Sequence, residues 1–199
     1  MKTLALLTLA ATIVPNLVGA SQAISADERA GLIFMREEEK LARDVYRKLE
    51  SKWGSRPFGN IARAEETHTA SVKTLLDRYS IPDPMKDDAP GKFQDKDLQK
   101  LYDQLIADGM KSRVEALKVG VLIEELDIAD LERWVAKTKL PDIKNVYENL
   151  TRGSRNHLRA FYQSLKRQGG SYTPKHLSQA AFDKIVNGTM ERGGVGGAG

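Results

Sequence analysis

Acidic and imidazole side chains interrupt apolar helical stripes at several places in this sequence. Between residues 114 and 135, apolar residues recur three and four positions apart, as on one face of an α-helix, and Glu124 stands among them. The same spacing places four further polar residues at the centres of stripes: Glu39, Glu65, His68 and His157. An unpaired carboxylate inside a stripe would be strongly destabilising unless it is protonated, paired with a charge or bound to a metal ion. A metal ion would satisfy all of these groups at once.

Glu65 and His68 are three positions apart, so on a helix they leave the same face and can bind one ion or bridge two. A single Glu-x-x-His pair is weak evidence, because ordinary surface polarity explains most such pairs. Its weight comes from the coincidence with Glu39, Glu124 and His157, each near the centre of its own stripe. Carboxylates and imidazoles that converge inside a helical bundle are how non-haem iron is held.

The pattern of candidate ligands differs in one place from that of di-iron bundles. Those proteins use one Glu from each of two helices and a Glu-x-x-His pair from each of the other two. Here the residue three before His157 is Ser154, which is a poor iron ligand. Asp127 is the predicted additional ligand, because it lies one turn after the glutamate of its own helix, and Glu38 and Glu125 are alternatives. If none of these binds, the site holds one metal ion or holds two unequally.

The composition is that of a soluble globular protein, and it restricts the chemistry. The chain has 199 residues, 41% hydrophobic and 29% charged, which is enough for one domain with a sizeable core. Cysteine is absent, so thiolate nucleophiles, iron–sulfur clusters and Cys-based zinc sites are excluded, and oxygen and nitrogen ligands remain. The net charge of +4 is too small to imply nucleic acid, although residues 151–175 hold six basic side chains and no acid. That patch suits an anionic partner.

The periodicity and the turn signals predict an all-α fold with four long helices. Long helices are expected at about 25–52, 60–79, 111–137 and 142–168, a short one at about 96–107 and a terminal one at about 174–186. Short breaks at 53–57 and 139–141 predict two antiparallel hairpins, whereas the connection at 80–95 is long and contains three prolines. Two hairpins joined by one long crossover, here with a short helix in it, form the ferritin-like four-helix arrangement.

Residues 1–23 resemble a secretory signal peptide. A lysine precedes an apolar run at residues 4–18, small residues follow, and cleavage after Ala20 or Ala23 fits. The run is shorter than the ~20 residues of a spanning helix, which favours a cleaved signal over an anchor, and no other segment could cross a bilayer. We therefore expect a secreted or periplasmic protein, with a helical domain at residues 24–190 and a disordered glycine-rich tail at 191–199.

Three sequence blocks resemble the domain-of-unknown-function 2202 family, which is grouped with the ferritin-like proteins. They read REEEKLARDVY at 36–46, IEELDIADL at 123–131 and GSRNHLRAF at 153–161, and the resemblance covers about residues 25–187. It implies the ferritin-like fold, but the family has no settled activity to carry over. Tyr46, seven residues after Glu39, resembles the tyrosine that many ferritin-like sites keep near the glutamate of their first helix. Tyr46 is therefore the candidate catalytic residue, and the alternative is a core phenol.

Together these features predict an exported non-haem iron protein. The expected metal ligands come from all four long helices: Glu39, Glu65, His68, Glu124, Asp127 and His157. Two iron ions are expected, with manganese or a single ion as alternatives. The expected chemistry is metal-centred redox reaction with oxygen or peroxide, of the ferroxidase or peroxide-reductase type, with an unknown electron donor. Alternatives are a metal-poor bundle that binds an anionic partner and a metal-binding or sensing protein without turnover, and a homodimer remains open beside a monomer.

Overall fold

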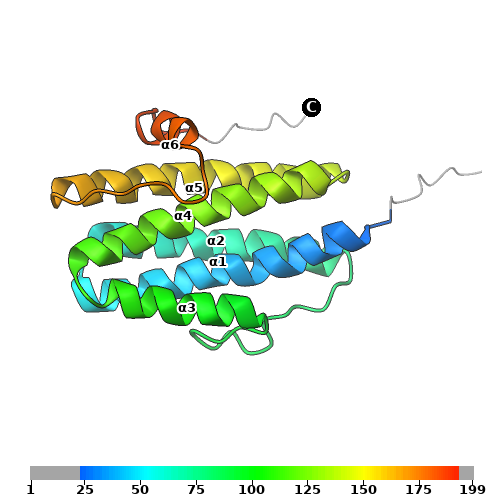
Figure 1. Ribbon diagram of the computed structural model, residues 1–199. Coiled ribbons are helices and arrows are strands. Elements are labelled where there is room, and N and C mark those ends of the chain that lie inside the picture. Colours follow the sequence, from blue (N-terminus) through cyan, green and yellow to red (C-terminus); the bar gives the residue numbers. More distant parts are fainter. Residues whose placement is uncertain (1–22, 193–199) are drawn as a thin grey trace, which may run out of the picture.

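The computed structural model describes residues 23–192, and within that range the chain forms six helices and no strand. They are α1 (Ala26–Trp53), α2 (Arg56–Arg78), α3 (Lys96–Gly109), α4 (Arg113–Lys137), α5 (Pro141–Arg167) and α6 (Gln179–Val186) (Figure 1). The predicted all-α fold is confirmed. Residues 1–22 of the predicted signal peptide and residues 193–199 of the predicted tail lie outside the described residues. Within the described range, no helix is long and apolar enough to span a membrane.

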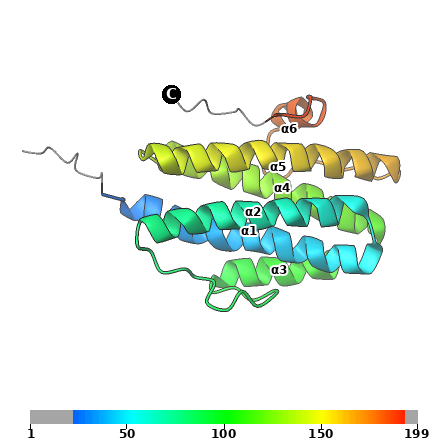
Figure 2. The ribbon, with the colours of Figure 1, turned by 180° about the vertical axis from the view of Figure 1, so that it is seen from behind.

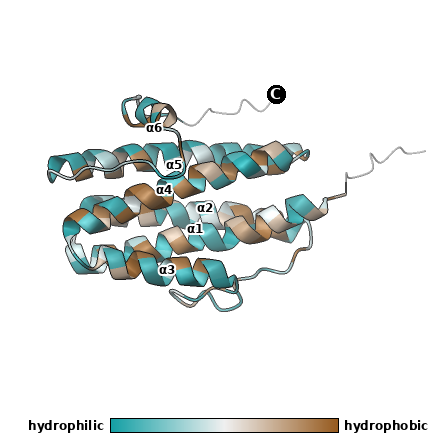
Figure 3. Cartoon of the chain, viewed as in Figure 1, coloured by the Kyte–Doolittle hydropathy of each residue, from teal (hydrophilic) through white to brown (hydrophobic). Residues whose placement is uncertain are grey.

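The four long helices pack as two antiparallel hairpins. α1 pairs with α2 and α4 pairs with α5, and the hairpins contact each other through α1 against α4 and through α2 against α5. Figures 1 and 2, which view the molecule from opposite sides, show α3 beside α1 and α6 beyond α5. Hydrophobic and hydrophilic residues alternate along the helices, as expected where one face of each helix is buried (Figure 3).

The start of α1 is fixed by a capping box that also reaches the second hairpin. The Ser25 side chain accepts a hydrogen bond from the N–H of Glu28, whose side chain in turn accepts from the N–H of Ser25. The other oxygen of Glu28 accepts from the N–H groups of Lys139 and Leu140, at 2.8 and 3.0 Å. One carboxylate therefore caps α1 and joins it to the connection between α4 and α5.

Two helices begin at other residues than the sequence predicted. α2 begins at Arg56 rather than near residue 60, because Pro57 lacks the N–H that the first helical turn would leave unbonded. α6 begins at Gln179 rather than near residue 174, because the N–H groups of residues 175–177 bond to the carboxylate of Glu125. The terminal helix is therefore shorter than predicted.

A layer of polar side chains divides the hydrophobic core in two. On α1, Met35 belongs to one apolar cluster and Leu41 to the other, and the buried Glu39 lies between them. The other long helices contribute buried polar residues to the same layer: Glu65, Glu124 and Ser154. Because the apolar clusters continue on both sides, the glutamates of this layer are surrounded mostly by apolar side chains.

The long crossover after α2 is fastened to α1 by charged side chains. Asp44 accepts hydrogen bonds from Lys40 Nζ at 2.5 Å and from the N–H of Gly91 at 2.9 Å. Lys40 Nζ also donates to the carbonyl oxygen of Ala89. Three further contacts join the same segments: Arg36 with Asp83, Glu37 with the N–H groups of Gln94 and Asp95, and Arg43 with Asp88. Most of the charges in the block at 36–44 thus position the crossover.

Replacing Asp44 by Ala should destabilise the fold strongly. The side chain of its partner Lys40 is only 1% exposed, and removing one member of a buried ion pair costs about 3–5 kcal/mol. Arg47→Ala is the matched control, because Arg47 pairs with Glu66 on the surface, where such pairs contribute about 0–1 kcal/mol. Urea unfolding followed by circular dichroism measures both free energies. Equal losses in the two variants would contradict the anchoring role of Asp44.

Candidate metal centre

The structure brings carboxylates and imidazoles from all four long helices to the polar layer of the core. Glu39 comes from α1, Glu65 and His68 from α2, Glu124 from α4 and His157 from α5. The three glutamates are at most 2% exposed. The two imidazoles reach the edge of the layer, with 13% and 12% of their side chains exposed.

Glu65 is the centre of the arrangement, because its two oxygens face different histidines. Oε2 lies 2.7 Å from Nδ1 of His68, and Oε1 lies 2.8 Å from Nδ1 of His157. The two imidazole rings stack with centroids 5.5 Å apart. Glu39 lies 3.2 Å from the His68 nitrogen, and Glu124 lies 3.4 Å from the His157 nitrogen.

Two groups of three ligand atoms therefore share one carboxylate. They are Glu39, Glu65 and His68, and Glu65, Glu124 and His157, and within each group one ligand atom per residue lies within 4.8 Å of the others. This is the spacing at which three atoms can contact one ion. Each group could hold a metal ion, and the two groups share Glu65.

Asp127, the predicted additional ligand, lies next to these groups but belongs to neither. One of its oxygens is hydrogen-bonded to the hydroxyl of Ser154, and the other is buried without a partner. Burial, with the charges of Glu39 and Glu124, raises the pKa of Asp127 well above its usual value. Ser154 occupies the position at which di-iron bundles have a glutamate ligand. Its hydroxyl orients Asp127, the residue predicted to take the place of that glutamate.

Neither Glu38 nor Glu125, the alternative additional ligands, joins the two groups. Oε1 of Glu125 accepts the N–H groups of residues 175–177, and its Oε2 accepts the Tyr172 hydroxyl at 2.6 Å. Both oxygens therefore hold the segment that leads into α6, and a ligand role for Glu125 is not supported. Glu38 is buried with one oxygen unpartnered, and burial, with Asp127 and Asp130, raises its pKa well above the usual value.

Tyr46, the candidate catalytic residue, contacts the centre through Glu124. Its hydroxyl donates to Glu124 Oε1 at 2.6 Å, and its ring packs against Phe58 and Phe161. Burial, with the charges of Glu124 and Glu65, raises the pKa of Tyr46 well above its usual value, so the phenol is neutral and remains a donor. Tyr46 fixes the orientation of one carboxylate of the second group.

Sequence reasoning missed the role of Gly153, which lies on α5 against His68. A Cβ at this position would come within 2.7 Å of His68 Nε2, so only glycine leaves room for the ring as it stands. The available signal was a glycine in the interior of a predicted helix. Such a glycine costs about 0.5–1 kcal/mol relative to Ala, which points to a close approach as its reason.

The electrostatics of the centre follow from burial opposed by charge pairing. Burial alone would raise the pKa of Glu65, but His68 and His157 outweigh it and lower that pKa. Burial disfavours the charged form of His157, yet Glu65 and Glu124 raise its pKa to about 10. Burial, opposed by His68, raises the pKa of Glu39 to about 7. Protons on the imidazoles thus supply the positive charge that the carboxylates need.

The residues present fit a metal centre of the iron or manganese type. Two buried carboxylate oxygens have no hydrogen-bond partner, Glu39 Oε1 and Asp127 Oδ1, and His157 Nδ1 has only the carboxylates of Glu65 and Glu124 beside it. Buried polar atoms are normally satisfied, so unpartnered ones that converge require an explanation. Carboxylate oxygens with two imidazoles are a donor set for iron or manganese, and a bound cation would satisfy the unpartnered atoms.

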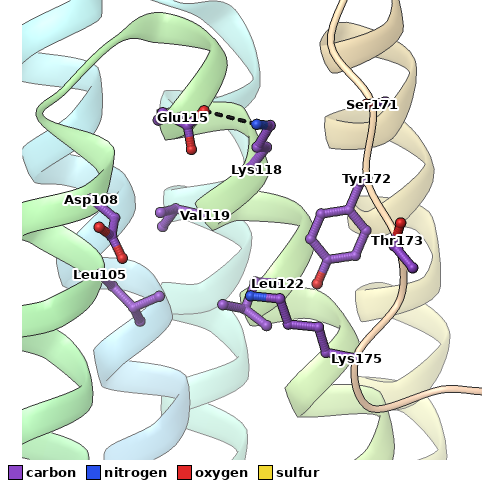
Figure 4. Close-up of a pocket in the computed structure, with 10 residues that line it drawn as sticks. All are labelled: Leu105, Asp108, Glu115, Lys118, Val119, Leu122, Ser171, Tyr172, Thr173 and Lys175. Atoms are coloured by element: carbon purple, nitrogen blue, oxygen red, sulfur yellow. Dashed lines mark hydrogen bonds and ion pairs between the residues drawn. The ribbon is translucent and has the colours of Figure 1, made fainter.

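Two cavities differ in their relation to this centre. One of about 380 Å³ lies between α3, α4 and the segment at 171–175, with Tyr172 and Lys175 on one side and the Glu115 and Lys118 pair on the other (Figure 4). None of the candidate ligands lines it. The other, of about 350 Å³, lies between α2 and α5 and is lined by His68.

The fold and the geometry define an all-helical protein with a buried carboxylate and imidazole cluster that could hold metal ions. The chain belongs to the DUF2202 family, described as an uncharacterized protein domain, which matches residues 28–189. Membership in the domain-of-unknown-function 2202 family, predicted from the three blocks, is thereby confirmed.

A relative of known sequence and a solved structure resemble the chain over most of its length. The uncharacterized protein MJ0754 of Methanocaldococcus jannaschii is 54% identical over 172 residues, which are 86% of this chain and 93% of that protein. The crystal structure of the hypothetical protein MJ0754 from Methanococcus jannaschii has a TM-score of 0.84 and 53% identity, and the match covers 86% of this chain and 98% of that one. The similarity therefore extends through the whole helical domain.

Binding of a divalent metal should weaken as the pH falls through about 7. Metal ligands bind in their deprotonated forms, Glu39 takes up a proton with a pKa of about 7, and His157 holds its proton up to about pH 10. More protons should therefore be released per bound ion at about pH 6 than at about pH 8. Calorimetric titration with Co²⁺ in buffers of different ionisation enthalpy measures this release. Equal release at both pH values would contradict the protonation of Glu39.

Proposed function

We propose that the protein is a ferritin-like, non-haem iron protein that binds two iron ions in its core and carries out redox chemistry with oxygen or peroxide. The observation that carries this proposal is the sharing of Glu65 between two three-residue groups of buried donors. A carboxylate with one oxygen toward each group can bridge two ions. The unpartnered atoms of Glu39 and Asp127 supply further ligand positions.

The proposed ferritin-like arrangement rests on the order and packing of the helices. Two antiparallel hairpins, joined by a long crossover that contains α3, pack side by side. The candidate ligands come from the middle of each of the four long helices, as in the di-iron carboxylate bundles. Together, topology and ligand placement support a ferritin-like four-helix bundle.

The side chains around the centre hold the donors in place. The Tyr46 hydroxyl donates a hydrogen bond to Glu124, and the Ser154 hydroxyl donates one to Asp127. Each of these carboxylates therefore has one oxygen held in place by a residue that is not itself a ligand. When bound, two ferrous ions would supply the two electrons that the reduction of one peroxide to water consumes. The apolar clusters on either side keep bulk water away from the buried glutamates, while the histidines reach the edge of the layer.

The reaction type within this proposal is ferroxidase or peroxide reductase. A ferroxidase takes its electrons from the ferrous ions that are its substrate. A peroxide reductase needs an electron donor from outside the protein for repeated turnover, because the chain has no cysteine to supply the electrons. Manganese, or one ion instead of two, would use the same donors. Export to the periplasm or beyond the cell is proposed from residues 1–23 alone.

The alternative of a binding module for an anionic partner has less support. Its basic patch at 151–175 includes Arg155 and Arg159, and both pair with Glu191, at 2.5 and 2.6 Å. Arg152 donates to Asn149 within its own helix. Two arginines of the patch are therefore neutralised within the molecule, whereas Arg152 keeps its charge, and the patch as a whole attracts an anionic partner less strongly.

Replacing the shared carboxylate tests the proposed function. Glu65→Gln removes the negative charge from both groups and an oxygen ligand from one of them. It should weaken iron binding on the order of 100-fold or more, beyond the 10–100-fold known for residues that only support a ligand. The anaerobic protein is loaded with Fe²⁺, its iron content is measured, and its reaction with oxygen or hydrogen peroxide is followed by near-ultraviolet absorbance. Iron bound by the wild type and lost in Glu65→Gln is the expected result.

Glu66→Gln is the matched control, because Glu66 is the next residue on α2 and lies exposed beside Arg47. This variant should bind iron as the wild type does. A wild type that binds no iron or manganese would overturn the proposal. Unchanged iron content in Glu65→Gln, with helicity retained, would overturn the central place given to Glu65.

A further inference from the structure

A cavity with mixed polar and apolar walls opens beside the candidate metal centre, between α2 and α5. It has a volume of about 350 Å³, and its walls include Thr67, Ser71, Asn149 and Arg152. A second cavity, of about 330 Å³, shares Ser71 with it and continues between the same two helices. A groove therefore follows the seam between α2 and α5 on the side where the two hairpins meet.

The inner wall of this cavity is formed by His68, a candidate metal ligand. His68 lines the cavity and, through Nδ1, lies 2.7 Å from the shared Glu65. Gly153 lines it as well, and the side chain that it lacks would occupy the space at His68 Nε2 and Cε1. His157 lies on the same side, 4.0 Å from the position of that absent side chain. The cavity thus ends at the imidazole edge of the centre, where the donors are least buried.

The lining favours small hydrophilic molecules that are neutral or negatively charged. Hydroxyl and amide groups form part of it, beside the apolar side chains of Val146 and Leu150, and Arg152 is its cation. Glu191, its one carboxylate, is bound by Arg155 and Arg159, so its charge is already paired. A free divalent cation would find no unpaired carboxylate in this wall, and a peroxide can form hydrogen bonds with its hydroxyl and amide groups, which an apolar gas cannot.

We propose that the cavity between α2 and α5 is the entry and binding site for a small hydrophilic oxidant of the peroxide class, which passes Thr67 and Ser71 to reach the metal centre at His68. The proposal rests on the proposed function and narrows its substrate from oxygen or peroxide to peroxide. In this proposal, the absence of a side chain at Gly153 keeps the inner end of the cavity open, and the positive charge of Arg152 disfavours cations.

Thiol labelling tests the cavity in the metal-free protein. Because the chain has no cysteine, Ser71→Cys introduces a single thiol into the cavity wall. The probes are an anionic and a cationic methanethiosulfonate, ethylsulfonate and ethylammonium, and each rate is divided by the rate of the same probe with free cysteine. Ser71→Cys should react about tenfold or more faster than the buried control Thr69→Cys, because labelling follows exposure.

The two probes decide the ligand class. Relative to free cysteine, the anionic probe should react faster than the cationic one in Ser71→Cys, and this preference should vanish when Arg152→Gln is added. A Ser71→Cys thiol as slow as Thr69→Cys would overturn the open cavity. A preference for the cationic probe would overturn the assigned ligand class.

Ligand binding at the loaded centre tests the route itself. Thr67→Trp places a large side chain at the exposed mouth of the cavity, and Ala70→Trp places one on the exposed surface of α2 away from its lining. The probe is azide, and its binding to the Co²⁺-loaded full-length protein is followed in the visible spectrum by stopped flow. Thr67→Trp should slow azide association by about tenfold or more, within the one to three decades over which on-rates vary among mutants of one site.

The outcomes separate the route from the proposed function. Slow azide association in Thr67→Trp alone, with equal cobalt content in all three proteins, supports the route. Equal rates in Thr67→Trp, Ala70→Trp and the wild type would overturn it, while cobalt binding would still support the metal centre. A wild type that binds no cobalt would overturn the proposed function, and the thiol labelling would still decide whether the cavity is open and which charge it favours.

Discussion

The structure depends on one buried carboxylate that must remain charged. Glu65 is 2% exposed and carries the imidazoles of His68 and His157 on its two oxygens. A carboxylate that has lost its water is tolerable only beside positive charge, so α2 and α5 must bring both histidines to it. Glu39 lies beside His68 and Glu124 lies beside His157, so these two carboxylates depend on the positive charge of the same imidazoles. The division of the apolar core into two clusters follows from this layer.

The first helix shows how one charged block serves two purposes. On one face of α1, Lys40 and Asp44 bind backbone groups of the crossover, while Glu39 on another face enters the polar layer. Because side chains one residue apart point in different directions on a helix, the same short segment can anchor a loop and supply a ligand. The crossover is thereby held to the same helix that supplies Glu39 to the polar layer.

The prediction from sequence succeeded where a regular period carried the information. The four long helices and the inward position of Glu39, Glu65, Glu124 and His157 follow from a spacing of three and four residues. The pairing into hairpins follows from the short breaks at 53–57 and 139–141. The predicted start of α6 near residue 174 was wrong, because the distant carboxylate of Glu125 binds the N–H groups of residues 175–177 and holds that segment outside the helix. The cavity at His68 was not predictable, because it depends on how far apart two helices lie.

The sequence by itself therefore determined which residues form helices and which acids and histidines face the interior, since both follow from local periodicity. Only the tertiary structure decided which of these groups meet. It placed Glu65 between two histidines, brought the Ser154 hydroxyl into hydrogen-bond contact with Asp127 and directed Glu125 toward the segment before α6. The physical reason is that a helix fixes the direction of each side chain relative to its own axis, whereas the distance between side chains on different helices depends on how the helices pack.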